Sequence, residues 1–523
     1  MAFILVTLCC AFAGLGSFLC GYDSGVIMSS IEQDAFIDRF GSPKLSDAVR
    51  GGIVSSYTGG AIVGSLLAPY ISDSNGRRMV IFIGGFLATL GAALQGGAVT
   101  IAMLVAGRFI TGVAVGLMSA TIPVYCSEIA PSHIRGLLAS MQQWMIGLGT
   151  IVAQWVGYSC SLRTGELTWR LPLSLQTVPA VILTCGILFL PESPRWLIDI
   201  GKEQAGRSVL TRLHLNRNAT NNQFVEHELN QIYEIVSHEQ RSVVWSWHRT
   251  LFSKQWRYRI ILACGLQVFT QTSGTNVIQN YGPSLYKTLG LSTSTSLMII
   301  GVWGALVVFW NTIFMLFIDK VGRRKLLIPS LLGMGAAMCV EATLARYIDF
   351  SDSNANRDAL RAAIAMFFVF SFFFTGLGLI SWIYQSEIFP TAIRARGSSV
   401  ATATNWSLNV IFAQCSPLAL TNIGSNYFYC FVGFNWAAVF LVWFWYPETV
   451  GRSLEEVEEV FKEKDQQLEV IPGKVSSERA PSRSHVKHKG MDPLSMHPTT
   501  TNGSWSSKSG SSPKLWSKKT EEV

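Results

Sequence analysis

Two charged side chains stand alone inside long apolar stretches of the sequence. Asp23 is the only charged residue within residues 3–27, and Arg108 is the only one within residues 101–123. An ionisable group is costly in such surroundings, so it is expected to be paired and to serve a function. Arg108 is the natural partner for Asp23. The pair is then either a permanent structural ion pair or a functional one whose charge changes during activity.

Three short motifs that contain charged residues occur twice, in the same order. The pairs are Asp73-Ser-Asn-Gly-Arg-Arg78 with Asp319-Lys-Val-Gly-Arg-Arg324, Ser127-Glu-Ile-Ala-Pro131 with Ser386-Glu-Ile-Phe-Pro390, and Pro191-Glu-Ser193 with Pro447-Glu-Thr449. The two copies of each motif are 246, 259 and 256 residues apart, respectively. This near-constant spacing over half the chain indicates a duplicated unit.

The composition requires an apolar environment for most of the chain. Of 523 residues, 49% are apolar and 14% are charged, and the mean hydropathy is +0.33. Soluble globular chains are about 25% charged. A helix of about 20 apolar residues can span a membrane. We predict twelve such helices, at residues 3–27, 51–70, 79–99, 101–123, 137–158, 173–190, 260–281, 294–318, 326–346, 362–385, 397–420 and 427–446.

Charge placement predicts the orientation of these spans. The net charge is +8, but the basic residues fall in short loops and in the tail and do not form a nucleic-acid patch. The positive-inside rule then places the Gly-Arg-Arg loops and both termini in the cytoplasm. The expected parts are an N-terminal six-helix half (1–190), a cytoplasmic helical linker (191–259), a C-terminal six-helix half (260–461) and a disordered cytoplasmic tail (462–523).

We therefore predict an all-α membrane protein with twelve transmembrane helices in two pseudo-symmetric six-helix bundles. Repeats of this kind underlie alternating access, in which a substrate is held between the halves. The ten cysteines have neither zinc-site nor disulfide spacing, and neither a nucleophile elbow nor a phosphate loop is present. We expect no metal, no cofactor, no enzyme activity and no nucleic-acid partner, and a monomer in the lipid bilayer.

As a set, the motifs resemble those of the sugar porter family of the major facilitator superfamily, and its fungal members most of all. The resemblance runs from about Phe18 to Glu459. It implies the major facilitator fold, a plasma-membrane location and transport of a sugar or sugar-like molecule. The motifs that carry it are Gly21-Tyr-Asp23 with Gly25, both Gly-Arg-Arg loops, Pro123-Val-Tyr-Cys-Ser-Glu128, Pro191-Glu-Ser-Pro-Arg-Trp196, Gly274-Thr-Asn276, Trp382 with Glu387, and Pro447-Glu-Thr449 followed by Gly451.

The resemblance also implies roles for the charged residues. In proton-coupled members, the pair that matches Asp23 and Arg108 links proton binding to sugar binding. We therefore expect proton symport, and the alternative is an uncoupled facilitator. The repeated motifs resemble the family's cytoplasmic gate, in which arginines pair with glutamates. The expected gating residues are Asp73, Arg77, Arg78, Glu128, Arg135, Asp319, Arg323, Arg324, Glu387 and Arg394.

A sugar site needs hydrogen-bonding side chains and an aromatic face. By resemblance, the residues expected there are Gln143, Gln154, Gln271, Asn276, Tyr281, Trp382, Asn405, Trp406 and Asn409. The alternative role for such amides is bonding between helices. Thr270, Asn280 and Leu379 depart from the family's pattern, and the first two put an ordinary glucose specificity in doubt. A carrier of a non-sugar metabolite therefore remains an alternative, as does a non-transporting sugar sensor, although such sensors have much longer tails.

Overall fold

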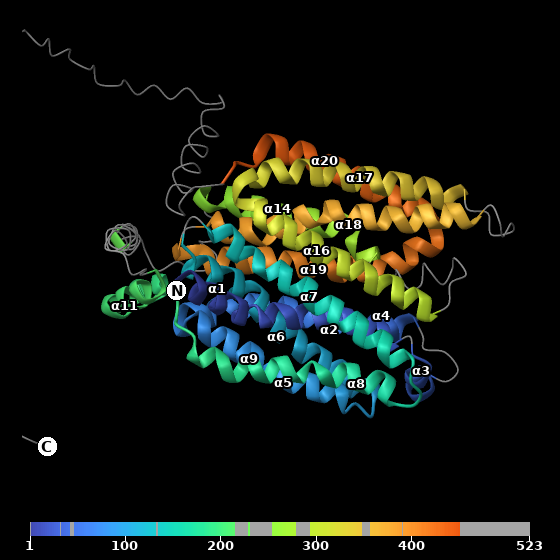
Figure 1. Cartoon of the computed structure of the whole chain (residues 1–523), viewed down its shortest axis with the longest axis horizontal. Coiled ribbons are helices and arrows are strands. Elements are labelled where there is room, and N and C mark those ends of the chain that lie inside the picture. Colours follow the sequence, from blue (N-terminus) through green and yellow to red (C-terminus); the bar gives the residue numbers. More distant parts are fainter. Residues whose placement is uncertain are drawn as a thin grey trace, which may run out of the picture. The chain divides into compact units, whose positions relative to one another are not determined.

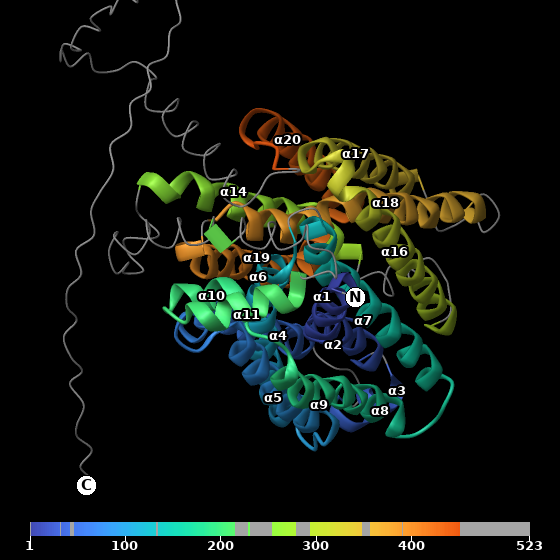
Figure 2. The same cartoon turned by 60° about the vertical axis from the view of Figure 1, so that its left-hand side comes forward.

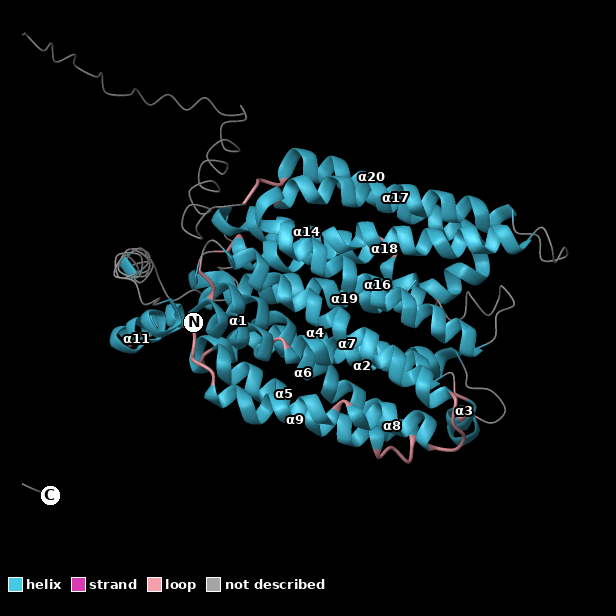
Figure 3. Cartoon of the chain, in the orientation of Figure 1, coloured by secondary structure: helices cyan, strands magenta, loops and turns pink. Residues whose placement is uncertain are grey.

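The fold is described from a computed structural model of the chain. The structure describes residues 2–31, 33–41, 47–131, 134–214, 229–230, 254–278, 293–347, 356–389 and 391–449. Within these ranges the regular structure is entirely helical (Figure 3). Tyr281 and Asn280 lie outside the described residues, as do the tail at 462–523 and most of the expected linker beyond His214.

The long helices of the first half lie side by side, with the short helices α3 and α11 at opposite ends of them (Figure 1). They are α1 (Ala2–Ala13), α2 (Leu15–Ile31), α3 (Asp34–Phe40), α4 (Asp47–Asn75), α5 (Arg77–Gly96), α6 (Ile101–Ile129), α7 (Arg135–Ser161), α8 (Leu167–Leu175), α9 (Thr177–Gly186), η2 (Ile187–Phe189), α10 (Pro194–Asp199) and α11 (Glu203–His214). Glycines bring two of these helices into backbone contact. A Cβ atom at Gly60 or Gly64 on α4 would meet the backbone of α6, and one at Gly112 or Gly116 on α6 would meet that of α4. Spacing small residues by four is a common way to pack membrane helices closely.

The second half repeats this arrangement with a second set of helices (Figures 1 and 2). They are α14 (Lys254–Thr272), α16 (Thr293–Val321), α17 (Arg323–Tyr347), α18 (Asn356–Glu387), α19 (Thr391–Ile423), η3 (Gly424–Asn426) and α20 (Tyr427–Trp445). The helices α17 and α18 pack on each other, as do α17 and α20, and α14 and α19. The halves meet where α4 contacts α19 and where α7 contacts α16.

Each of the twelve predicted spans overlaps a helix. Among the described residues, nine segments are both long and apolar enough to cross a membrane. The remaining three predicted spans fall on α7, α14 and α19, which are equally helical but carry more polar side chains. These three helices hold most of the amide residues expected in the site. The lower hydropathy of these three helices therefore reflects the same polar residues that are predicted to bind the substrate.

Candidate functional site

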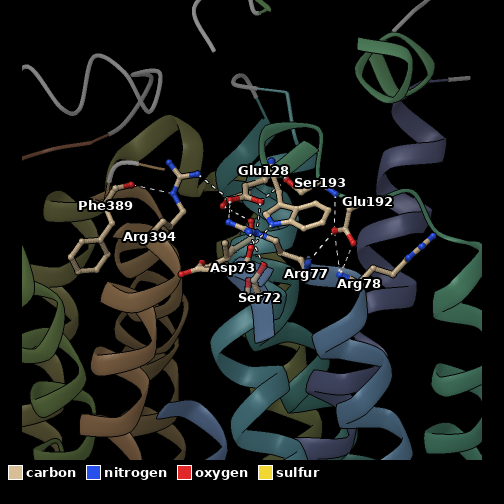
Figure 4. Close-up of polar contacts among 12 residues, drawn as sticks. Ser72, Asp73, Arg77, Arg78, Glu128, Glu192, Ser193, Phe389 and Arg394 are labelled. Carbon is tan, nitrogen blue, oxygen red and sulfur yellow. Dashed lines mark hydrogen bonds and ion pairs between the residues drawn. The ribbon is translucent and has the colours of Figure 1, made fainter. Parts of the chain in front are cut away.

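A cluster of charged residues joins the ends of several helices in the first half (Figure 4). Arg77 begins α5, and its guanidinium meets the carboxylate of Glu128 on α6 with Nε–Oε2 at 3.0 Å and Nη2–Oε1 at 3.2 Å. Both side chains are buried. The hydroxyl of Ser193 also donates to Glu128, with Oγ–Oε2 at 2.6 Å. A buried charge is tolerated when it is paired and hydrogen-bonded in this way.

Glu192 holds the start of α5 from the other side. Its carboxylate accepts hydrogen bonds from the backbone N–H groups of Arg77 at 3.0 Å and Arg78 at 3.2 Å. These are groups that a helix N-terminus leaves without a partner, and a negative charge is favourable there. Burial raises the pKa of Glu192, and the backbone N–H bonds oppose that shift. Gly76 precedes the helix with φ of 89°, a conformation that favours glycine.

The second half repeats these contacts and adds an ion pair between Arg323 and Asp319 at 3.0 Å. Arg323 meets Glu387 at 2.8 Å, and the hydroxyl of Thr449 donates to Glu387 at 2.9 Å. Glu448 accepts from the backbone N–H groups of Arg323 at 2.8 Å and Arg324 at 3.0 Å. The three repeated motifs therefore meet in space in each half. We call the two copies together the charged cluster, which comprises Arg77, Glu128, Glu192, Ser193, Arg323, Glu387, Glu448 and Thr449.

Three contacts at the charged cluster cross between the halves. Arg394 on α19 lies 3.5 Å from Glu128, and Arg396 lies 3.3 Å from Asp73 on α4. The backbone N–H of Leu137, at the start of α7, donates to Asp319 at 2.8 Å. These contacts hold the two halves together at this end of the helices.

The second arginine of each Gly-Arg-Arg motif is placed differently from the first. Arg78 donates to the carbonyl oxygens of Leu188 and Leu190, both at 3.2 Å. Arg324 donates to the carbonyl oxygen of Trp443 and lies 5.4 Å from the centre of its ring. Both arginines therefore bind carbonyl oxygens at the end of a neighbouring helix. In the described residues, neither takes part in the ion pairs of Glu128 and Glu387. Arg135 is buried at the start of α7.

The predicted pair of Asp23 and Arg108 is present and fully enclosed. The distance from Oδ1 of Asp23 to Nη1 of Arg108 is 3.4 Å, and each side chain is 1% exposed. Arg108 also donates to the carbonyl oxygen of Ile53 at 3.1 Å, and its guanidinium lies 4.9 Å from the ring centre of Tyr57. Arg108 therefore has partners besides the carboxylate, whereas Oδ2 of Asp23 has no hydrogen-bond partner in the described part of the chain.

Amide side chains on α14, α18 and α19, together with Asn276 just after α14, form a continuous chain of hydrogen bonds. Gln271 donates to Asn405 at 3.0 Å, Asn409 donates to Asn276 at 3.1 Å, and Asn276 donates to Gln271. The chain continues through two residues that the sequence reasoning missed. Asn405 donates to Gln267 at 2.7 Å, and Gln267 donates to Gln385 at 2.8 Å. We call these six residues the amide network.

Tryptophans connect the amide network to the first half. Trp382 on α18 donates to Gln143 on α7 at 3.0 Å. Trp406, which follows Asn405 on α19, donates to Ser119 at 3.3 Å. Its ring also meets the ring of Tyr57 edge-on, with centroids 5.8 Å apart.

Gln154, another predicted site residue, takes part in none of the hydrogen bonds described for the amide network or the two tryptophans, and its amide oxygen has no partner among the described residues. Its amide is next to Gly304 on α16, where a Cβ atom would collide with it. The departure at Thr270 lies beside the amide network, and its buried hydroxyl donates to the carbonyl oxygen of Leu266 at 3.0 Å. The single O–H donor of Thr270 is used in this bond, whereas a glutamine at that position would offer two N–H donors and an acceptor oxygen. Leu379 is fully buried.

Two residues in the site had a usable sequence signal, and two had none. Gln267 precedes Gln271 by one helical turn, and Gln385 follows Trp382 by one turn, so both share a face with a predicted residue. Tyr57 and Arg396 had no such signal, because an aromatic in a span and an arginine near a span's end are common.

The geometry matches solved structures of a known transporter. The proton:xylose symporter XylE bound to 6-bromo-6-deoxy-D-glucose gives a TM-score of 0.77 at 26% identity, covering 88% of this chain and 100% of the other. The inward-open form of XylE from E. coli gives a TM-score of 0.63 over the same 88% of this chain and 100% of the other, also at 26% identity. The protein is thus a membrane transporter with the major facilitator fold.

The sequence comparisons define the family. The model described as "Sugar (and other) transporter" matches residues 9–461. The MFS-type transporter criB of Aspergillus cristatus is 33% identical over 463 residues, which cover 88% of this chain and 94% of that protein. The high-affinity glucose transporter of Kluyveromyces lactis is 32% identical over 466 residues, with coverage of 86% and 84%. The chain belongs to the Sugar (and other) transporter family and, like its relatives, is a carrier and not an enzyme.

Proposed function

We propose that this protein moves a sugar or sugar-like small molecule across the plasma membrane by alternating access, with protons as the coupling ion. The observation that carries the proposal is the amide network, which lies against the first half through Trp382 and Trp406. Amides donate and accept hydrogen bonds as sugar hydroxyls do, and the indole rings supply flat apolar faces. A sugar can replace the amide–amide bonds with bonds to itself.

The coupling step is assigned to the pair formed by Asp23 and Arg108. A proton on Asp23 removes the charge that holds Arg108 on that side. Arg108 stacks on Tyr57, and Tyr57 meets Trp406 in the opposite half. This contact series gives a physical route by which the charge of Asp23 acts on the sugar site.

The charged cluster serves as the gate in this proposal. It belongs on the cytoplasmic side, together with both chain termini, because the Gly-Arg-Arg loops are rich in positive charge. In the structure the cross-half contacts of Glu128, Asp73 and Asp319 are formed. The TM-score is also higher for the sugar-bound XylE structure, at 0.77, than for the inward-open one, at 0.63, which supports a closed cytoplasmic end. Release to the cytoplasm requires these contacts to break.

Uptake measurements in a yeast that lacks its own hexose carriers test the proposal. We expect uptake of one or more compounds from a radiolabelled panel of hexoses, pentoses, disaccharides, polyols and sugar acids. A protonophore should abolish accumulation, because it removes the proton gradient. Asp23→Asn should do the same with the protein still at the cell surface, since the amide is nearly isosteric but cannot release a proton.

Each other outcome selects a different function. Uptake that survives both the protonophore and Asp23→Asn, without accumulation above the external concentration, would make the protein an uncoupled facilitator. No uptake of any sugar by surface-located protein would favour a non-sugar substrate, for which Thr270 beside the amide network is the specific observation. Sugar binding without uptake would identify a sensor.

A Tyr57 substitution tests the route from the proton site to the sugar site. Tyr57→Leu removes the ring that touches both Arg108 and Trp406, so we expect sugar-driven proton uptake to weaken more than sugar exchange. Tyr57→Phe keeps the ring and should retain most coupling. The measurement is the ratio of protons to sugar taken up by proteoliposomes. An unchanged ratio in Tyr57→Leu would remove this residue from the route.

A further inference from the structure

A buried carboxyl group in the second half has no part in the proposed transport cycle. Glu341 lies on α17, within a segment able to span the membrane, and is 5% exposed. Among the described side chains, Oε2 of Glu341 has no hydrogen-bond partner, and Glu341 belongs to none of the ion pairs formed there. Such a group contrasts with Asp23, whose carboxylate has Arg108 beside it.

The internal repeat relates this position to the proton site of the first half. Gln95 and Glu341 are 246 residues apart, the same spacing as the two Gly-Arg-Arg motifs. Gln95 is fully buried, lies next to Asp23 and donates to the hydroxyl of Thr111 at 2.8 Å. The second half therefore has a carboxyl group at the position that corresponds to the edge of the Asp23 site.

The cation of that site has no counterpart in the second half. Arg108 and Phe367 are 259 residues apart, the spacing of the two Ser-Glu-Ile motifs on the same helices. Phe367 is 3% exposed and belongs to the apolar core of the second half. The second half thus has a carboxyl group at the position of Gln95 and a phenylalanine at the position of Arg108.

Among the side chains that the structure describes, the helices packed against α17 provide no positive charge at the level of Glu341. These elements are α18, α20, η3 and, more weakly, α16. Arg361, the nearest described cation on α18, is exposed and lies about 9 Å along the helix from the level of Phe367. The tyrosines are engaged elsewhere, because Tyr429 bonds to Thr343 and Tyr427 bonds to Ser416, both at 3.1 Å. The other titratable groups at this end whose side chains are described are Cys339 on α17 and Cys430 on α20.

We propose that Glu341 is a second proton-binding site, which holds one proton as a neutral carboxylic acid in this conformation. An isolated carboxylate in apolar surroundings is strongly disfavoured, and uptake of a proton from water removes its charge. The site does not depend on coupling through Asp23, and it exists whether or not the proposed symport is correct. It makes the two halves chemically unequal, with an ion pair in one and a neutral acid in the other.

Residue-resolved labelling with a hydrophobic carbodiimide tests this assignment on the full chain in lipid vesicles. The reagent reacts with protonated carboxyl groups in apolar surroundings. The carboxyl oxygen bonds to the central carbon of the carbodiimide while the proton passes to its nitrogen, and an acyl shift then gives a stable N-acylurea. We expect an adduct on the peptide that contains Glu341, with a yield that falls as the pH is raised. Glu341→Gln should lose this adduct, and Asp23→Asn should keep it.

An infrared spectrum provides a second readout that does not involve a reagent. Wild-type protein should show the C=O stretching band of a protonated carboxyl group, and Glu341→Gln should lose that band while Asp23→Asn retains the Glu341 contribution. Mass spectra without the Glu341 adduct, together with identical infrared spectra for wild type and Glu341→Gln, would overturn the proposal. If Glu341→Gln does not fold, the pH dependence of the wild-type adduct decides the question alone. Sugar uptake is measured in parallel, so failure of symport is seen separately.

Discussion

At the scale of single residues, the partners of the buried polar groups determine which groups are held in place and which can exchange their hydrogen bonds with a ligand. Arg108 has three contacts, to Asp23, Ile53 and Tyr57, so its charge is held from several sides. The amides of α14 and α19 instead bond to one another. A bonded pair of amides is a site that a ligand can enter by exchange, because hydrogen bonds lost to the protein are regained with the ligand.

Removing one amide from this network should weaken substrate binding. Gln271 bonds to both Asn405 and Asn276, so Gln271→Ala leaves two partners unsatisfied and removes the contact proposed for the sugar. Loss of about 1.4 kcal/mol corresponds to a roughly tenfold rise in KM for uptake. Thr272→Ala is the matched control, since its hydroxyl bonds only to carbonyl oxygens of its own helix. An unchanged KM in Gln271→Ala would place the substrate elsewhere.

At the scale of elements, the repeated motifs act as caps on helix ends. Glu192 caps α5, and Glu448 caps α17 through the same pair of backbone N–H groups. In each case the next residue, Ser193 or Thr449, bonds to the glutamate of the ion pair. In each half these bonds fix three parts at one point. They are the start of one helix, a neighbouring helix and the segment that follows the sixth span of that half.

Loss of either cap should lower stability by a similar amount. Glu192→Ala and Glu448→Ala each remove an acceptor from two N–H groups, and loss of a cap costs about 1 kcal/mol. We expect both variants to show a lower Tm in detergent. Glu203→Ala is the control, because Glu203 is an exposed acid in the first turn of α11. A drop confined to one of the two caps would contradict the equivalence of the halves.

The elements were predictable from the sequence to a greater degree than the contacts between them. Apolar runs locate each span because a membrane helix must present apolar side chains over its length. The pairing of Arg77 with Glu128 follows from charge and repetition. The cap made by Glu192 and the ring contact of Tyr57 with Trp406 depend on three-dimensional approach of distant segments, which hydropathy does not encode. Gln267 and Gln385 belong to none of the repeated motifs, and only their spacing of one helical turn from Gln271 and Trp382 indicates the direction in which they point.

At the scale of the whole molecule, the two halves are joined at one end by charges. The contacts of Glu128 with Arg394 and of Asp73 with Arg396 cross the boundary, and so does that of Asp319 with the start of α7. Buried ion pairs are a poor source of net stability but strongly resist the loss of one partner. This makes them suited to holding one of two conformations.

Neutralising Glu128 should shift the molecule toward the form with this end open. Glu128→Gln weakens its contacts with Arg77 and Arg394, and the buried arginines then favour solvent. We expect faster hydrogen exchange at the backbone amides that begin α7 and α19, measured by mass spectrometry. Glu166→Gln, which breaks an exposed pair with Arg170, should leave exchange there unchanged. Equal exchange in wild type and Glu128→Gln would separate the charged cluster from opening.

If the amide network is the substrate site, as proposed, its internal hydrogen bonds also determine what the carrier does when it is unloaded. Each of its six side chains has a partner within the network, so departure of the substrate strands no buried polar group there. A carrier whose vacant site were unsatisfied would have to wait for a new molecule before turning over, and would only swap one molecule for another. Here the vacant form is internally satisfied, which predicts net flux down the combined gradient without an obligatory counter-substrate on the opposite face.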